Sequence, residues 1–144
     1  KKAGQAADAA GIELSTMIIL GLGGKELTEE HAIHTADILN ALSPSMLGIM
    51  TLLPRAGTPL ERQIEVGQFQ RLSRQETLQE LLTLLTRLNL PRPSILRASH
   101  IYNFVNLAGT LPEDKETLLA QVRQSLEQEP TIEKELTYKN YGIF

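Results

Sequence analysis

The sequence predicts an α/β domain with a parallel sheet made of three βα units. Residues 14–21 and 46–53 are short, nearly continuous runs of apolar and β-branched residues, as in strands buried on both faces. A weaker run, residues 94–98, follows the same pattern, and longer stretches with helical spacing of apolar residues lie between and after the runs. Buried strands that alternate with amphipathic helices are typical of right-handed crossovers between parallel strands.

The expected elements run in the order helix, strand, helix, strand, short helix, helix, strand, helix. They are a helix over 1–10, a strand over 14–21, a helix from Thr28 to about 42, a strand over 46–53, an ambiguous segment over 60–69, a helix from Ser73 to about 88, a strand over 94–98, a loop over 99–109 and a helix between Leu111 and Pro130. The clearest start signal is the S-x-x-E capping box of Ser73 and Glu76. Three strands do not close a barrel that normally takes about 250 residues. We therefore expect a segment of a barrel or of an open parallel sheet.

Composition places the chain among ordinary soluble domains. It has 144 residues, a formal net charge of −3 and no cysteine, which excludes a strongly basic nucleic-acid binder, a disulfide framework and cysteine-ligated metal centres formed by this chain alone. No apolar run approaches the roughly 18 residues of a membrane span, and no leader is recognisable, so we expect a cytoplasmic protein. Residues 1–130 form the expected domain and residues 131–144 a C-terminal extension. The start at Lys1 suggests a fragment.

Three loops follow the predicted strands and are expected to lie on one edge of the sheet. They are residues 21–24, 54–59 and 99–103, and ligands of parallel α/β folds gather at this edge. The glycine-rich loop fails both phosphate fingerprints: Glu26 replaces the third glycine of G-x-G-x-x-G, and no hydroxyl residue follows Lys25 as a P-loop requires. A nucleotide-phosphate binder that uses residues 21–24 therefore ranks last among the hypotheses.

Isolated titratable residues give weaker signals. His31 and His34 have a spacing that can hold a metal on one helix face, but they lie in polar first turns far from other ligands, so no metal site is predicted. His100 directly follows a predicted strand. Arg55 and Arg97 could bind a carboxylate or phosphate.

Two segments resemble a known enzyme family. Residues 17–30 (MIILGLGGKELTEE) resemble the fifth strand and following loop of radical S-adenosylmethionine (radical SAM) enzymes, and residues 51–60 (TLLPRAGTPL) resemble their sixth strand and its P-R-x-G-T-P loop. Residues 99–103 (SHIYN) and 106–115 (NLAGTLPEDK) resemble the end of iron–sulfur oxidoreductases related to oxygen-independent coproporphyrinogen oxidase. The likeness, shared in part with biotin-synthase-like and methylthiotransferase-like relatives, covers about residues 1–128.

The resemblance implies the C-terminal part of a radical SAM, TIM-like parallel barrel. It implies that S-adenosylmethionine (SAM) and a [4Fe–4S] cluster serve the parent protein, whose C-x-x-x-C-x-x-C loop is missing here, so this chain binds no cluster and is inactive alone. The implied SAM-binding residues are Ile19, Gly21, Gly23, Leu53 and Pro54, of which Ile19 and Leu53 contact adenine. Arg97, His100 and Asn103 are implied on the substrate side.

Two further hypotheses concern an alternative function and the partners of the chain. The alternative to a radical SAM fragment is a non-catalytic α/β binding or assembly module that never had a cluster half. For either, we expect a small-molecule ligand rather than a membrane or nucleic acid. A partial barrel also leaves strand edges and an apolar face uncovered, so we expect copies of the chain to self-associate.

Overall fold

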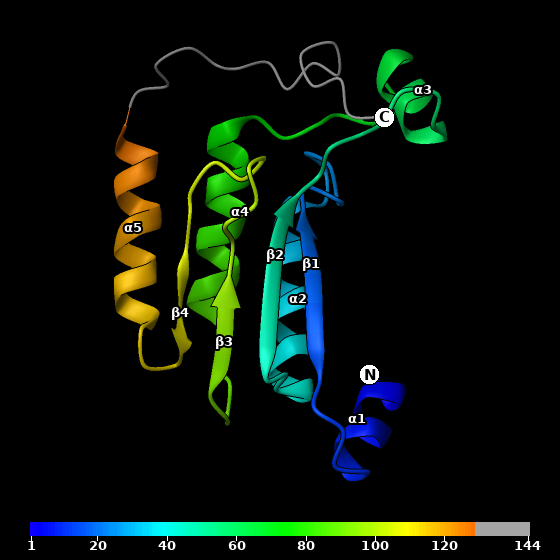
Figure 1. The fold of residues 1–144 in the computed structure, drawn as a ribbon. Helices are drawn as coiled ribbons and strands as arrows, with labels where there is room; N and C mark the ends of the chain where they lie inside the picture. The colour runs from blue at the N-terminus through cyan, green and yellow to red at the C-terminus, as the bar shows by residue number, and fades with distance from the viewer. Residues whose placement is uncertain (129–144) are drawn as a thin grey trace.

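The computed structural model describes residues 1–128 as a four-stranded sheet with five helices (Figure 1). The elements are α1 (Lys2–Ala9), β1 (Ser15–Leu20), α2 (Thr28–Leu42), β2 (Met46–Thr51), α3 (Pro59–Glu65), α4 (Arg74–Arg87), β3 (Ser94–Arg97), β4 (Ala108–Leu111) and α5 (Lys115–Glu127). The C-terminal extension expected over 131–144 lies outside the described residues. None of the helices within residues 1–128 is both long and apolar enough to cross a membrane.

The first three strands are parallel neighbours in chain order. The sheet order is β1-β2-β3-β4, with Ser15 beside Met46 and Met46 beside Ile95. Helix α2 connects β1 to β2, and α3 and α4 connect β2 to β3. The α/β class and the three predicted parallel strands are therefore confirmed, whereas a closed parallel barrel is not shown.

The fourth strand corrects the sequence interpretation. Residues 99–109 were expected to be a loop and a helix was expected from Leu111, but β4 pairs antiparallel with β3, and Leu111 lies beside Ser94. The helix begins only at Lys115, because Asp114 closes a turn: its Oδ2 accepts the backbone N–H of Thr110 at 2.7 Å. Residues 112–114 thus form a turn between β4 and the helix.

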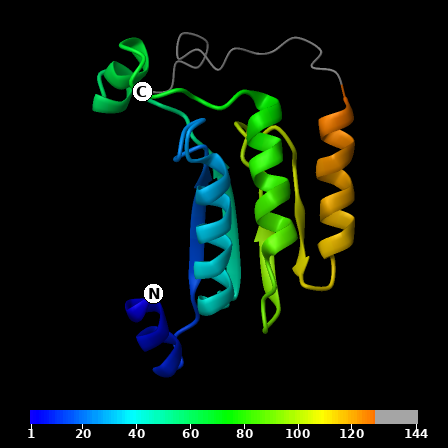
Figure 2. The same cartoon turned by 180° about the vertical axis from the view of Figure 1, so that it is seen from behind.

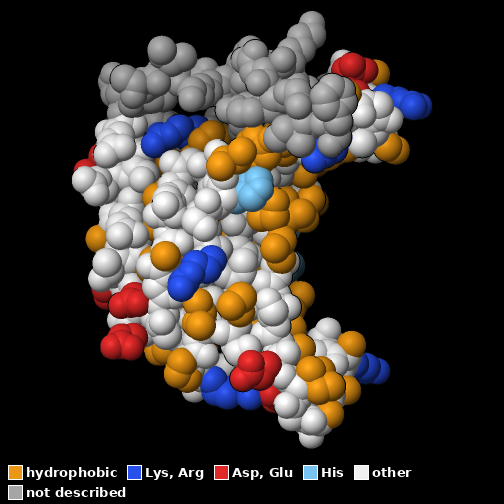
Figure 3. All heavy atoms as spheres, viewed as in Figure 1, with side chains coloured by type: hydrophobic (Ala, Val, Ile, Leu, Met, Phe, Trp, Pro, Cys, Tyr) orange, Lys and Arg blue, Asp and Glu red, His pale blue; other side chains and the backbone are white. Residues whose placement is uncertain are grey.

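The helices α2, α4 and α5 all cover the same face of the sheet, as Figure 2 shows from behind. No helix within residues 1–128 covers the opposite face, and Figure 3 shows apolar side chains exposed over this open face, chiefly along the β1 side. Side chains alternate along each strand, so Met17 and Ile19 of β1 and Met46 and Met50 of β2 belong to this open face. Met17 is 67% exposed and Met46 43%.

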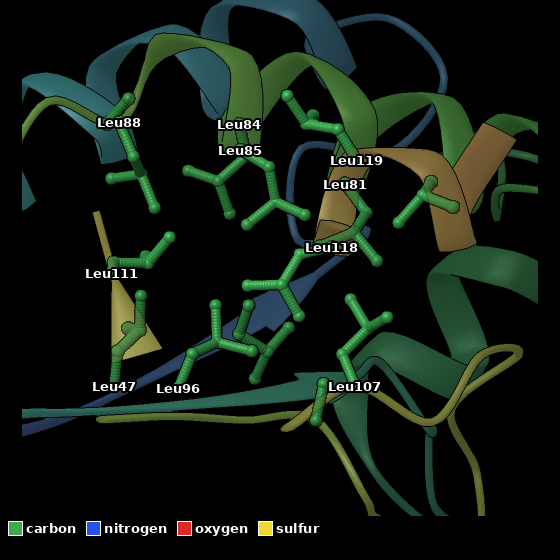
Figure 4. Close-up of a cluster of buried hydrophobic side chains, with 14 of the residues drawn as sticks. Leu47, Leu81, Leu84, Leu85, Leu88, Leu96, Leu107, Leu111, Leu118 and Leu119 are labelled. Carbon is green, nitrogen blue, oxygen red and sulfur yellow. The ribbon is translucent and has the colours of Figure 1, made fainter. Parts of the chain in front are cut away.

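The core lies between the sheet and these helices and consists mainly of leucine (Figure 4). Leu47 and Leu96 point into it from β2 and β3, while Leu84 and Leu85 of α4 meet them from above and are almost fully buried. Leu118 and Leu119 of α5 complete the layer. The buried leucines of α4 therefore lie at the centre of the core.

Polar side chains bind the free backbone groups at both ends of α4. The capping box of α4 is confirmed: Ser73 Oγ accepts from the N–H of Glu76, and the Glu76 carboxylate accepts from the N–H of Ser73. At the other end of α4, Lys115 Nζ donates to the carbonyls of Thr86 and Leu88 at 2.8 and 2.7 Å. A cation at this terminus also opposes the helix dipole.

Candidate functional site

The carboxyl ends of β1 and β2 lie side by side at one edge of the sheet. The N–H of Leu52, the first residue after β2, donates to the carbonyl of Leu20, the last residue of β1, at 2.9 Å. A Cβ on Gly21 would lie 3.6 Å from the Cβ of Leu52. This edge is where parallel α/β folds place their ligands.

The turn after β1 (residues 21–24, the glycine turn) needs its glycines for two different reasons. Gly21 and Gly24 have φ angles of +86° and +59°, which L side chains rarely adopt. Gly23 instead packs tightly: a Cβ there would lie 2.7 Å from the carbonyl oxygen of Leu27, directly before α2. The turn is closed by a hydrogen bond from the N–H of Gly24 to the carbonyl of Gly21.

Residues just before α4 hold the far end of the glycine turn. The N–H of Lys25 donates to the carbonyl of Gln70 at 3.0 Å, and a Cβ on Gly24 would lie 3.2 Å from the Phe69 ring. The ammonium of Lys25 lies 2.9 Å from Glu76 Oε1 in an ion pair that is partly exposed. The segment 69–76 therefore lines one side of the turn.

Glu80 of α4 holds the near end of the same turn and is completely buried. Its Oε1 accepts the N–H of Gly21 at 2.9 Å and lies 3.0 Å from Nδ1 of His31, and its Oε2 accepts the hydroxyl of Thr28 at 2.6 Å. Thr28 begins α2, as expected from the sequence. The residue before it is Leu27, and the Thr28 hydroxyl is bound to Glu80.

The pKa of Glu76 lies below its ordinary value of 4.5, mainly because the N–H of Ser73 donates to it and secondarily because of Lys25. A carboxyl group whose pKa is lower in the folded than in the unfolded state stabilises the fold at pH values above the unfolded-state pKa. This stabilisation is lost as the pH falls through the pKa of the folded state. We therefore expect the free energy of unfolding to decrease as the pH is lowered from about 4.5. Glu76→Gln should flatten that fall in urea titrations at pH 3 to 6, and equal slopes would contradict the assignment.

The implied SAM-binding residues all lie at or beside the same edge. Ile19 faces the open side of the sheet near the end of β1, next to Met50 in the register. Leu53 and Pro54 follow β2; Leu53 is half-buried and Pro54 buried. The structure thus brings Ile19, Gly21 and the residues after β2 together, and a contact with adenine stays a prediction.

The three implied substrate-side residues lie at the end of β3, two strands from Gly21. Arg97 and His100 are exposed; Arg97 donates to the carbonyl of Leu96 at 2.8 Å, and the His100 ring packs 5.0 Å from the ring of Tyr102. Asn103 is bound to β2: its amide accepts from the hydroxyl of Thr51 and donates to the carbonyl of Ile49. Asn103 therefore holds the loop in place, and its substrate role stays a prediction.

The hollows near this edge lie on the helix side of the sheet and are small. One, between Leu20, Thr51, Thr77 and Phe104, opens toward Gly21 and holds about 20 Å³. A second hollow, lined by Leu20, Ile49 and Phe104 among others, holds about 10 Å³. Such spaces admit about one water molecule each. A ligand of nucleoside size does not fit into either of these two hollows.

The two histidines of α2 have different surroundings. His31 lies against the buried Glu80, whereas His34 is exposed. Within residues 1–128, no three His, Cys, Asp or Glu side chains are grouped so that they could hold a metal ion.

Sequence reasoning missed Glu80, although a signal was present. Thr77 and Leu84 lie three residues before and four residues after Glu80, and both are buried, so helical spacing puts Glu80 on the leucine face. A carboxylate on an apolar face needs partners. The partners come from β1 and α2, which periodicity cannot identify.

Comparison with protein-family models, curated proteins and solved structures finds no match for this chain.

Proposed function

We propose that this chain is the C-terminal part of a radical SAM oxidoreductase or transferase, and that the edge formed by β1 and β2 binds the adenosyl group of SAM. The observation that carries the proposal is the one-sided sheet. Three parallel strands follow one another in chain order, and the long helices α2, α4 and α5 all cover one face. A (β/α) barrel has this arrangement, whereas doubly wound sheets carry helices on both faces.

The open face suits a flat, largely apolar ligand. Ile19 and Met50 supply aliphatic and thioether surface beside the edge, and positive φ at Gly21 leaves the backbone there without a side chain. The hollows behind the sheet are too small for an adenine, so the proposed contact is with Ile19, Leu53 and the glycine turn from the open side.

The residues of this chain do not fit an iron–sulfur cluster, because none of the 144 is cysteine. In the parent enzyme, a cluster bound elsewhere would supply the electron that cleaves SAM. This chain contributes binding and orientation of the adenosyl group, together with a wall that includes Arg97 and His100. Arg97 is suited to a substrate carboxylate, since its exposed guanidinium offers paired donors.

The test uses the protein encoded by the complete gene, purified anaerobically and supplied with iron, sulfide and a strong reductant. We expect a C-x-x-x-C-x-x-C motif before Lys1 and conversion of SAM to 5′-deoxyadenosine. A gene that encodes no such cysteines contradicts the proposal, and so does a cluster-loaded protein that leaves SAM intact.

The second candidate is a non-catalytic binding or assembly module, favoured by the exposed apolar face. In either case, we propose that copies of this chain associate through that face and the edge of β1. Within residues 1–128, β1 pairs with a strand on one side only, and the strand carries no charge or proline to oppose pairing with another copy.

Met17→Lys is expected to reduce this association, because it places a charge in the centre of the exposed edge strand. Sedimentation should show dimers or larger species for the original chain at micromolar concentration and mainly monomers for the variant. Ile38→Lys is the matched control, since Ile38 is 49% exposed but lies on α2. A monomeric original chain, or equal dissociation by both variants, would refute the assignment of this surface.

A further inference from the structure

Two carboxylates of α4 hold the two ends of the glycine turn. Glu80 accepts the N–H of Gly21, and Glu76, four residues earlier, pairs with Lys25. Residues four apart lie on the same side of a helix. Helix α4 thus acts as a rigid support against which the turn is fixed.

Glu80 is the more informative of the two because burial makes a carboxylate costly. Its side chain is fully buried, and burying a charge is unfavourable unless it is hydrogen-bonded or paired. Apolar residues of similar volume often serve stability as well or better at such positions. A carboxylate, unlike an apolar side chain, fixes the orientation of its neighbours, because it binds donors from the end of β1 and from two residues of α2.

The Leu20–Gly21 peptide is held on both sides by these contacts. Its carbonyl accepts the N–H of Leu52, and its N–H donates to Glu80. The plane of this peptide is therefore set by β2 on one side and α4 on the other. The φ angle of Gly21, which is positive, is a rotation about the bond that leaves this peptide plane. By fixing the plane, Glu80 determines where the rest of the turn lies.

We propose that Glu80 is the positioning residue of the adenosyl site, fixing the Gly21 peptide so that the glycine turn presents its backbone to the nucleoside. This inference rests on the proposed function. Glu80 itself does not touch the ligand, because its carboxylate is buried behind the turn on the helix side.

The experiment compares Glu80→Gln with two controls in the 144-residue chain. Glu116→Gln removes an exposed carboxylate from α5, and Leu119→Ala destabilises the core away from the turn. Amide hydrogen exchange of Gly21 under native conditions measures the positioning, and titration with SAM measures binding. Glu80→Gln should speed Gly21 exchange and weaken SAM binding by about tenfold each, since an uncharged amide with a single acceptor oxygen replaces the two carboxylate oxygens that accept from Gly21 and Thr28. Both controls should leave local Gly21 exchange and SAM affinity unchanged.

The outcomes separate the two proposals. A folded Glu80→Gln with normal Gly21 exchange overturns the role of Glu80. Faster exchange without SAM binding by any variant, the original chain included, keeps the support of the turn but overturns the adenosyl site. If Glu80→Gln does not fold, Thr28→Val replaces it, because it removes only the donor to Oε2. That variant should raise Gly21 exchange and the Kd for SAM about threefold, and two unchanged values overturn the proposal.

Discussion

Leu85→Ala is expected to lower the free energy of unfolding by about 3 to 5 kcal/mol. Leu85 is fully buried in α4, where the helix faces β2 and β3 across the leucine layer (Figure 4). Removing its side chain loses the transfer free energy of the buried carbons and leaves a cavity, because leucines from three elements surround it and cannot all move in. Urea unfolding followed by circular dichroism measures the change.

Ile38→Ala is the control for Leu85→Ala. Ile38 lies on α2 and is half-exposed, so little buried surface is lost. We expect a change of about 1 kcal/mol or less for this control. Similar losses for the two variants would mean that α4 does not pack on the sheet as described.

Gly23→Ala is expected to cost about 2 to 3 kcal/mol of stability, which is large for the addition of one methyl group. The new Cβ would lie 2.7 Å from the carbonyl oxygen of Leu27 and 3.1 Å from Cβ of His31. The first of these is a backbone atom before α2 and cannot rotate away, so the turn or the helix must shift. Thermal unfolding gives the measurement.

Gly48→Ala is the matched control for Gly23→Ala. A Cβ there would lie 3.5 Å from the end of the Met17 side chain, an ordinary contact in the middle of β2. We expect unchanged or slightly higher stability, because alanine is less flexible than glycine in the unfolded chain. A Gly23→Ala variant as stable as Gly48→Ala would contradict the tight packing of the glycine turn on α2.

The same packing changes how Gly23→Val should be interpreted. The hypothesis of a nucleotide-phosphate binder predicts that this substitution abolishes nucleotide binding. Since a larger side chain at Gly23 displaces the backbone of Leu27, lost binding would follow from a disturbed turn for any ligand at this edge. Substitutions at Ile19 and Leu53, which keep the turn intact, test the adenosyl site more cleanly.

The parallel strands and their helices could be predicted because their signals are local. Residues 14–21 and 46–53 are nearly continuous runs of apolar and β-branched residues, followed by a glycine-rich and a proline-rich segment. Ser73 with Glu76 marks the start of α4 without reference to the rest of the chain. The helical spacing of the leucines in α4 likewise identifies the buried face of that helix. Each of these features depends on residues within a few turns or one strand.

The features that were missed depend on contacts between distant residues. The β4 sequence, AGTL, has no strand signal of its own and becomes a strand because β3 offers an edge and Asp114 closes the following turn. Glu80 lies 59 residues from Gly21 in sequence, so its hydrogen bond to that glycine follows only from the packing of α4 on the sheet. The candidate residues Ile19, Gly21 and Leu53 could be placed at one edge because parallel strands align their carboxyl ends.

The measurement that tests the central claim most directly is a titration of the ¹⁵N-labelled chain with SAM, followed by amide chemical shifts. We expect saturable shifts confined to the glycine turn, the end of β1 around Ile19, and Leu53 after β2. We also expect Ile19→Ala, which leaves the turn intact, to weaken binding about tenfold. The absence of saturable shifts in these residues, or shifts centred on another part of the chain, would contradict the assignment of this edge as the adenosyl site.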